Sequence, residues 1–112
     1  MTKDQLKKTY EEEIKRIVTA LRAYNPERII LFGSAARGRI HPESDIDICF
    51  VKENIDPLKT KRALRDLLWQ KGYTWEKEPD IHVYDAKIYQ DWLARGDPFI
   101  TEIEKGKVVY AR

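Results

Sequence analysis

Two aspartates, Asp45 and Asp47, interrupt an otherwise apolar and β-branched stretch that reads SDIDICFV. The pattern predicts a strand over residues 45–51. A spacing of two puts both carboxylates on one face of the strand, while Ile46 and Ile48 point to the other face. Neighbouring carboxylates in a buried strand suffer desolvation and mutual repulsion, which a raised pKa or a bound cation relieves. The pair therefore indicates a divalent metal site.

A glycine-serine turn precedes the aspartates. The apolar run over residues 29–32 predicts a buried strand, and Gly33-Ser34 ends it abruptly. Gly33 permits a tight turn with exposed backbone N–H groups, Ser34 adds a hydroxyl donor, and residues 34–37 are expected to begin a short helix that attracts phosphate. Mg²⁺ is commonly held by one or two carboxylates together with substrate phosphates. The two features together predict a nucleoside triphosphate as substrate.

Simpler interpretations of these residues stay open. Asp45 and Asp47 would then be a surface pair at the start of a strand, and Gly33-Ser34 would be an ordinary turn. The apolar residues that alternate with the aspartates favour a buried strand over the first interpretation. The aspartate pair downstream of the turn favours a functional role over the second.

Gly33-Ser34, ten intervening residues and Asp45-Ile46-Asp47 resemble the GS-x10-D-x-D signature of the DNA polymerase β-like nucleotidyltransferases. The fuller stretch GSAARGRIHPESDIDI is similar to the minimal nucleotidyltransferases, known as MNT proteins. In that family a third acidic residue on a later strand completes the metal site, and Asp80 in EPDIHVYD occupies the matching position. The resemblance covers most of the chain, because members of this size also have an N-terminal helix and a C-terminal segment like PFITEIEKGKVVY.

The resemblance implies a fold, a reaction and a set of site residues. The implied fold is α/β (α+β), a polymerase β-like palm whose mixed sheet has helices packed mainly on one face. The implied reaction uses ATP as substrate and two Mg²⁺ ions, one on the triphosphate and the leaving pyrophosphate, the other lowering the pKa of an acceptor hydroxyl. By this resemblance, the metal-binding and catalytic residues are Asp45, Asp47 and Asp80, and Asp80 helps to deprotonate the acceptor. The implied nucleotide-binding residues are Gly33, Ser34 and Arg37.

Neighbouring polar residues are open to other interpretations. Asp80 follows Pro79 and also suits a turn or helix cap, and Arg37 also suits an ordinary exposed surface. His82 lies on the same predicted face as Asp80, but the family pattern is apolar there. We therefore leave His82 out of the predicted site.

The resemblance also suggests a partner. MNT proteins are commonly paired with small all-helical HEPN proteins as antitoxin and toxin, and some of these antitoxins adenylylate a tyrosine of the toxin. The corresponding hypothesis is a protein adenylyltransferase that acts as the antitoxin of a type VII toxin-antitoxin pair. Two alternatives stay open: a non-catalytic antitoxin that neutralises its toxin by binding, and a small-molecule nucleotidyltransferase.

Helices are expected on both sides of the first two strands. Thr2 and Gln5 form a capping box that begins an amphipathic helix, and Pro26 closes it. Asp56 and Pro57 begin a second helix that ends at Gly72. Its predicted core face consists of Leu58, Leu64, Leu67 and Leu68. Its basic surface over residues 57–71 is either a solvated face or a contact for a partner or nucleotide.

The C-terminal part is predicted to alternate between strands and helices. Residues 73–75 are expected to form a short strand and residues 81–84 a clear one. Asp85 then caps a helix that ends at Gly96, and Asp97-Pro98 begins a last short helix that ends at Gly106. Residues 108–110 are expected to form a terminal edge strand.

The composition limits the classes of protein to which this chain can belong. A chain of 112 residues predicts a single domain over residues 1–112, and a hydrophobic content of 42% with 36% charged residues is typical of a soluble globular protein. No apolar run has the length of a membrane span or signal peptide, so a cytoplasmic location is expected. The single cysteine, Cys49, excludes an internal disulfide, and a net charge of +2 does not favour general nucleic-acid binding. Self-association stays open.

Overall fold

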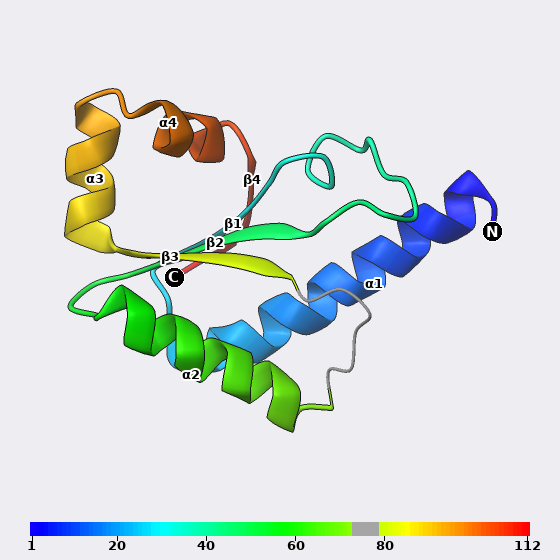
Figure 1. Ribbon diagram of the computed structural model, residues 1–112, viewed down its shortest axis with the longest axis horizontal. Coiled ribbons are helices and arrows are strands. Elements are labelled where there is room, and N and C mark those ends of the chain that lie inside the picture. The colour runs from blue at the N-terminus through cyan, green and yellow to red at the C-terminus, as the bar shows by residue number, and fades with distance from the viewer. Residues whose placement is uncertain (73–78) are drawn as a thin grey trace.

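The computed structural model describes residues 1–72 and 79–112. Among the described helices, none combines the length and the apolar character that a membrane crossing requires. The elements follow in the order α1 (Lys3–Leu21), the 3₁₀ turn η1 (Arg22–Tyr24), β1 (Arg28–Phe32), β2 (Asp47–Lys52), α2 (Pro57–Gln70), β3 (Asp80–Asp85), α3 (Ala86–Ala94), α4 (Pro98–Glu104) and β4 (Lys107–Ala111) (Figure 1).

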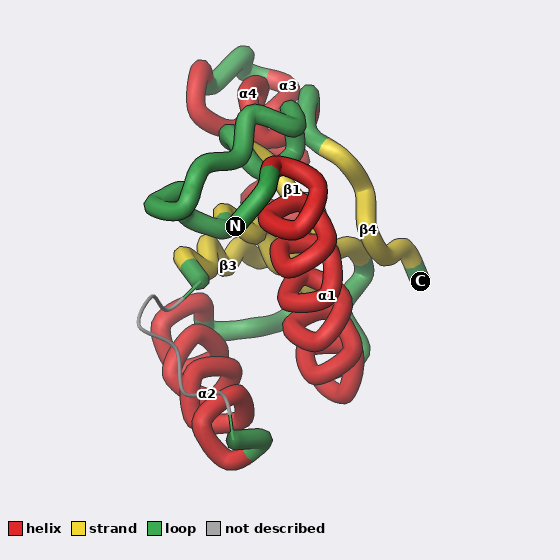
Figure 2. The backbone as a smooth tube through the Cα atoms, turned by 90° about the vertical axis from the view of Figure 1, so that its right-hand side faces the viewer, coloured by secondary structure: helices red, strands yellow, loops and turns green. Residues whose placement is uncertain are grey.

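The described strands form one four-stranded mixed sheet in the order β3-β2-β1-β4. β1 is antiparallel to both of its neighbours, whereas β2 and β3 are parallel. A parallel pair needs a crossover connection, and α2 lies in the connection between β2 and β3. The edges of the sheet are β3 and β4, which lie on opposite sides of the molecule (Figure 2). The expected terminal edge strand is confirmed.

Each face of the sheet has its own buried cluster. One face packs against α1 and α2, and this cluster contains Ile17, Val18, Leu21, Ile29, Leu31, Ile48, Phe50, Leu64, Leu68 and Ile81. The other face packs against α3 and α4, and this cluster contains Ile30, Cys49, Val51, Ala86, Tyr89, Ile100 and Ile103. The predicted α/β class with a mixed sheet is confirmed. The two long helices lie on one face, and the two short helices cover part of the other (Figures 1 and 2).

The helix starts confirm the capping predictions. The Thr2 hydroxyl accepts a hydrogen bond from the Gln5 N–H at 3.1 Å, and the Gln5 side chain accepts one from the Thr2 N–H at 2.8 Å. Asp56, Asp85 and Asp97 accept hydrogen bonds from first-turn N–H groups of α2, α3 and α4. Asp85 both ends β3 and caps α3, so it turns the chain back over the sheet.

Two predictions of local structure near the predicted site were wrong. β2 begins at Asp47, so Asp45 lies in the preceding loop and not in the strand. Residues 34–38 form hydrogen-bonded turns instead of a helix start, with the Arg37 N–H donating to the Gly33 carbonyl at 3.3 Å. Gly38 has a φ of 72°, which a right-handed helix does not allow. The chain therefore loops away from the sheet after one turn.

One predicted core residue of α2 was also wrong. Leu64 and Leu68 are buried, but the side chain of Leu58 is 70% exposed. Leu58 precedes Leu64 by six residues, which places it about 120° away around the helix and off the core face. The short strand expected at residues 73–75 lies outside the described residues.

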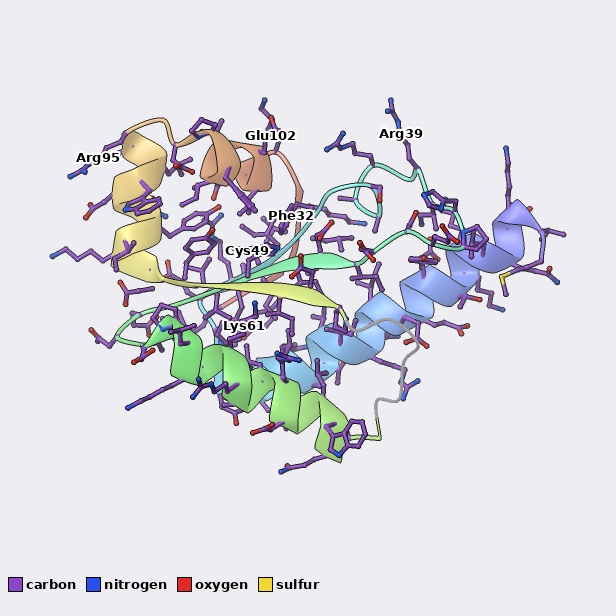
Figure 3. The ribbon with its side chains drawn as sticks, in the orientation of Figure 1. Phe32, Arg39, Cys49, Lys61, Arg95 and Glu102 are labelled. Carbon is purple, nitrogen blue, oxygen red and sulfur yellow. The ribbon has the colours of Figure 1, made fainter. Side chains whose placement is uncertain are left out.

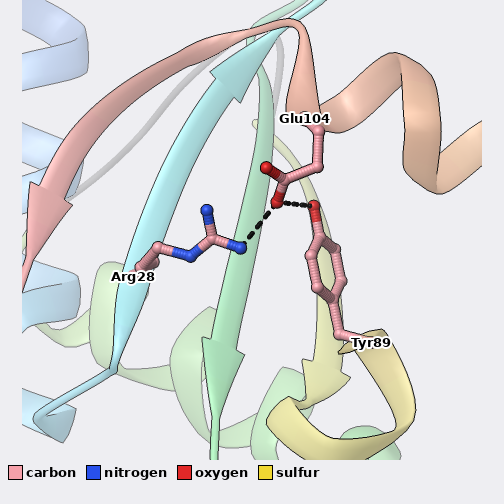
Figure 4. A network of polar contacts seen from close by, with 3 residues as sticks. All are labelled: Arg28, Tyr89 and Glu104. Carbon is pink, nitrogen blue, oxygen red and sulfur yellow. Dashed lines mark hydrogen bonds and ion pairs between the residues drawn. The ribbon is translucent and has the colours of Figure 1, made fainter. Parts of the chain in front are cut away.

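A polar network joins β1 to both short helices (Figure 4). The Arg28 Nη2 donates to Glu104 Oε1 at 2.6 Å, and the Tyr89 hydroxyl donates to the same oxygen at 2.8 Å. The Arg28 guanidinium also lies 5.5 Å from the centroid of the Tyr89 ring. Since Tyr89 is fully buried, the network fixes α3 and the end of α4 against the sheet.

Glu104→Gln is expected to destabilise the protein by about 1–2 kcal/mol at neutral pH, because a charge-assisted pair of hydrogen bonds is lost. The hydrogen bond from Arg28 holds the pKa of Glu104 below its ordinary value. The stabilisation is therefore complete above the pKa of an unfolded glutamate and is lost as the pH falls through the lower folded-state pKa. Urea unfolding at about pH 7 and about pH 3 measures this. An equal difference between parent and variant at both pH values would contradict the assignment.

Candidate active site

Asp47 and Asp80 lie side by side at the start of two parallel strands. Asp47 is the first residue of β2, Asp80 is the first residue of β3, and the register pairs them directly. The Asp80 N–H donates to the Ile46 carbonyl at 2.9 Å, which fixes this register at the end of the ladder. Because paired residues of adjacent strands project from the same face, the structure brings together two of the three predicted carboxylates.

His82 joins the two carboxylates. One ligand atom from each of Asp47, Asp80 and His82 lies within 4.8 Å of the others, and His82 Nε2 is 3.2 Å from Asp80 Oδ2. The imidazole ring makes edge contacts with Phe32 and Phe99, at centroid distances of 5.2 and 5.3 Å. Sequence reasoning left this residue out. The sequence feature that indicates His82 is its spacing of two residues from Asp80, which puts both side chains on the same face of one strand.

Asp45 is placed differently from the other two aspartates. It is exposed in the loop before β2 and is not part of the group formed by Asp47 and its neighbours. The Tyr10 hydroxyl of α1 donates to the Ser44 carbonyl at 2.5 Å, and the buried Ser44 Oγ accepts from the His41 N–H at 2.9 Å. These bonds anchor the loop, and Asp45 lies close enough to Asp47 to raise the pKa of that carboxyl.

The electrostatics of the site favour a bound cation. Partial burial raises the pKa of Asp47 above its ordinary value, and the negative charge of Asp80 raises it further. His82 lowers the pKa of Asp47, and Asp45 adds a smaller upward shift. A carboxylate whose ionised form is disfavoured in this way gains from a nearby positive charge.

The donor set fits a divalent metal ion. Asp47 and Asp80 offer the carboxylate oxygens that Mg²⁺ prefers. His82 offers an imidazole nitrogen, a ligand better matched to transition metals. His82 is therefore better placed to orient the carboxylate of Asp80 through its contact with Asp80 Oδ2. Hydrogen bonds to ligating carboxylates are common around metal sites.

Gly33 lies directly against the Asp47 carboxylate. Its φ is 76°, in the left-handed region that favours glycine, and a Cβ added there would lie 2.5 Å from Asp47 Oδ2. Any side chain at this position would collide with the carboxylate or displace it. The glycine of the predicted phosphate turn and the aspartate of the predicted metal site are thus in direct contact.

The turn after Gly33 presents backbone donors. Among the described residues, the N–H groups of Ser34, Ala35 and Ala36 and the Ser34 hydroxyl have no hydrogen-bond acceptor. Ala35 is buried against the core, which anchors the turn. Consecutive free N–H groups at a turn form an anion-binding concavity, so this backbone can bind phosphate without being a helix.

The basic residues of the loop lie farther out. Arg37 is exposed on the turn, and Arg39 points away from the body of the molecule (Figure 3). A cavity of about 680 Å³ lies between α1, this loop and β4. Arg37 lines that cavity, whereas Asp47 and Asp80 do not.

The one cysteine does not supply a nucleophile. Cys49 is fully buried between the sheet and the short helices (Figure 3), and burial raises the pKa of its thiol to about 12. The thiol therefore stays protonated at neutral pH. On this face of the sheet, the candidate groups for chemistry are therefore the carboxylates of Asp47 and Asp80 and the imidazole of His82.

His82→Gln is expected to weaken divalent metal binding by about 10-fold or more, because the imidazole that orients Asp80 is lost. Titration with Mn²⁺, followed by electron paramagnetic resonance of the free ion, measures the affinity. The matched control is His41→Gln, since His41 is the other histidine and lies in the exposed loop. Equal affinities for the two variants would show that His82 has no role at the metal.

Sequence comparison identifies the family of the chain. Residues 12–110 match the family model described as a nucleotidyltransferase domain, and the chain belongs to this family. A curated relative from Methanocaldococcus jannaschii, named "Putative protein adenylyltransferase", is 34% identical over 53 residues. This match covers 47% of the present chain and 54% of the relative, so it spans about half the length of that protein.

Structural comparison finds a chain of similar size. A crystal structure described as "a putative nucleotidyltransferase from Sulfolobus solfataricus" is 20% identical in sequence, with a TM-score of 0.49. The similarity covers 96% of the present chain and 90% of the other.

Proposed function

We propose that this chain is a Mg²⁺-dependent nucleotidyltransferase that transfers AMP from ATP to a hydroxyl group of a protein. The observation that carries the proposal is the pairing of Asp47 with Asp80 directly beside Gly33. A cation site and a phosphate-binding turn are then contiguous, as transfer of a nucleotide from a triphosphate requires. Membership of the nucleotidyltransferase domain family supports the reaction class.

The reaction follows from these neighbours. The acceptor oxygen forms a bond to the α-phosphorus of ATP, the bond from that phosphorus to the β-phosphate bridge breaks, and pyrophosphate leaves. Asp80 accepts the proton of the hydroxyl, and the His82 imidazole at 3.2 Å orients its carboxylate. The free N–H groups of Ser34 and Ala35 hold phosphate oxygens. Bound Mg²⁺ supplies charge neutralisation and lowers the pKa of the acceptor.

The acceptor in this proposal is a tyrosine of a helical HEPN-type toxin, with the present chain as its antitoxin. The motif from Gly33 to Asp47 supports this by its resemblance to the MNT proteins. The name of the Methanocaldococcus relative, which refers to protein adenylylation, supports a protein acceptor.

Intact-mass spectrometry tests the proposal. The protein is incubated with ATP, Mg²⁺ and the product of the neighbouring gene, and the double variant Asp45→Asn, Asp47→Asn serves as control. A mass gain of one or more AMP units on the partner, absent with the variant, is expected. Peptide mapping then identifies the modified side chain.

Other outcomes would support the other candidates. A stable complex without a mass gain would favour an antitoxin that acts by binding alone. Consumption of ATP that depends on an added small molecule, with no modified protein, would favour a small-molecule nucleotidyltransferase. Either result would overturn protein adenylylation as the function.

A further inference from the structure

The cavity of about 680 Å³ between α1, the loop after β1 and β4 is a groove with an apolar floor. We call it the α1–β4 groove. The N-terminal end of α1 extends beyond the strands (Figure 1), so Tyr10 and Ile14 are only half-buried, whereas Ile17 and Leu21 farther along the helix are buried completely. Part of the apolar face of α1 is therefore left uncovered. The floor of the groove is formed by Tyr10, Ile14, Val18, Ile40 and Val109.

Contacts at both ends fix the walls of the groove. At one end the Tyr10 hydroxyl donates to the Ser44 carbonyl and holds the loop on α1. At the other end the Arg22 guanidinium lies 4.8 Å from the centroid of the Tyr110 ring, which joins α1 to β4. The groove is therefore preformed, and little ordering of its walls opposes the binding of a ligand.

The rim of the groove is positively charged. Among the described residues of the lining, Glu11 is the one carboxylate. The net charge of the whole chain is only +2, so the rim carries a local excess of positive charge. A negatively charged ligand complements such a surface. The rim has five exposed cations, which are Lys7, Lys15, Arg22, Arg37 and Lys107.

We propose that the α1–β4 groove docks an acidic amphipathic helix of the protein acceptor. The inference rests on the proposed transfer of AMP to a protein, for which a binding surface outside the active site holds the acceptor. The part of α1 from Lys7 to Arg22 spans about 22 Å, which matches about four turns of a helix that lies alongside it. Such a helix places its apolar face on the floor and its carboxylates against the rim. A polyanion such as RNA would contact the rim and leave the floor exposed.

The groove lies next to the active site along the chain. Residues 35–38 line the groove, and they begin two residues after Gly33, which is in contact with the Asp47 carboxylate. The loop that follows β1 therefore forms a wall of the groove and also carries the phosphate turn. A protein bound in the groove lies beside the corner of the sheet where AMP transfer is proposed.

Binding of the product of the neighbouring gene, measured by biolayer interferometry without ATP, tests the groove apart from catalysis. The test variant is Lys7→Glu, Lys15→Glu. The matched control is Lys59→Glu, Arg62→Glu, which makes the same change of charge at exposed positions of α2. Arg37 stays unchanged, because it is also a candidate for nucleotide binding. We expect the affinity to fall by about 10-fold or more in the test variant and to stay within about twofold of the parent in the control.

A second pair of variants tests the apolar floor. Val109→Ser changes a residue of the floor, whereas Val108→Ser changes its neighbour on β4, which is 49% exposed and lies outside the lining. We expect Val109→Ser to weaken binding by about fivefold or more and Val108→Ser to leave the affinity unchanged.

Three results would overturn the proposal. The first is the absence of a complex between the parent protein and the neighbouring gene product. The second is equal affinity of the two charge variants, and if both still transfer AMP, the proposed function stands without the groove. The third is a loss of affinity with the charge variant but none with Val109→Ser, which would show a contact by charge alone. If the complex forms through the groove but no AMP is transferred, the groove stands and the proposed function fails.

Discussion

Asp47→Asn is expected to reduce AMP transfer by about a thousandfold or more. The substitution keeps the shape of the side chain but removes one of the two paired carboxylates. The lost metal interaction is worth several kcal/mol in the transition state, and each 1.4 kcal/mol is a factor of about ten in rate. Initial rates of pyrophosphate release at saturating ATP measure the loss. Activity within about tenfold of the parent would contradict the assignment of Asp47.

The same substitution is expected to stabilise the metal-free protein. The pKa of Asp47 is raised by burial and by Asp80, which shows that its charge is unfavourable in the fold without a cation. Removing like charges from directly paired positions gains up to about 1 kcal/mol, which corresponds to a few degrees in the thermal midpoint.

Asp45→Asn is the matched control for this stability effect. Asp45 is exposed in the loop, so the neutralised charge is the same but the local repulsion is smaller. The thermal midpoint in EDTA should rise for Asp47→Asn. The free energy of unfolding of Asp45→Asn should stay within about 0.5 kcal/mol of that of the parent. Added Mg²⁺ should then stabilise the parent but not Asp47→Asn. Destabilisation of the metal-free protein by Asp47→Asn would refute the electrostatic account.

Gly33→Ala is expected to lower AMP transfer by about a hundredfold and to destabilise the fold by more than about 1 kcal/mol. The left-handed φ of 76° is unfavourable for alanine. In addition, the new methyl group would lie 2.5 Å from Asp47 Oδ2 and force the carboxylate to move. A displacement of about 1 Å at a reacting centre typically has an effect of this size on rate.

Gly38→Ala separates the two effects. Gly38 has a similar φ of 72°, but an added Cβ there meets nothing within 4 Å. This variant should therefore show the conformational destabilisation, about 1 kcal/mol in urea unfolding, with much less loss of activity. If both variants lose activity equally, the contact between position 33 and Asp47 is not what matters.

Local features of the fold were predictable because they depend on few neighbours. The start of α1 at Thr2 follows from hydrogen bonds within one turn, and the stop at Gly96 follows from a left-handed φ of 76°. The motif predicted a metal site and a phosphate-binding turn for one substrate, whereas the direct contact between Gly33 and Asp47 depends on the β1–β2 pairing.

Features that depend on the sheet register were not predictable from the sequence. The pairing of Asp47 with Asp80 depends on a parallel alignment across the β2–β3 crossover. His82 lies on the same strand face as Asp80, and its ring contacts aromatic residues of β1 and α4.

The most direct test of the central claim uses ATP labelled with radioactive phosphorus at either the α or the γ position. The protein and the product of its neighbouring gene are incubated with each label and Mg²⁺, with Asp47→Asn in parallel. Nucleotidyl transfer predicts covalent α label on the acceptor, one pyrophosphate released per label, no γ label, and neither product with the variant. Covalent γ label, or α label that does not depend on Asp47, would contradict nucleotidyl transfer at this site.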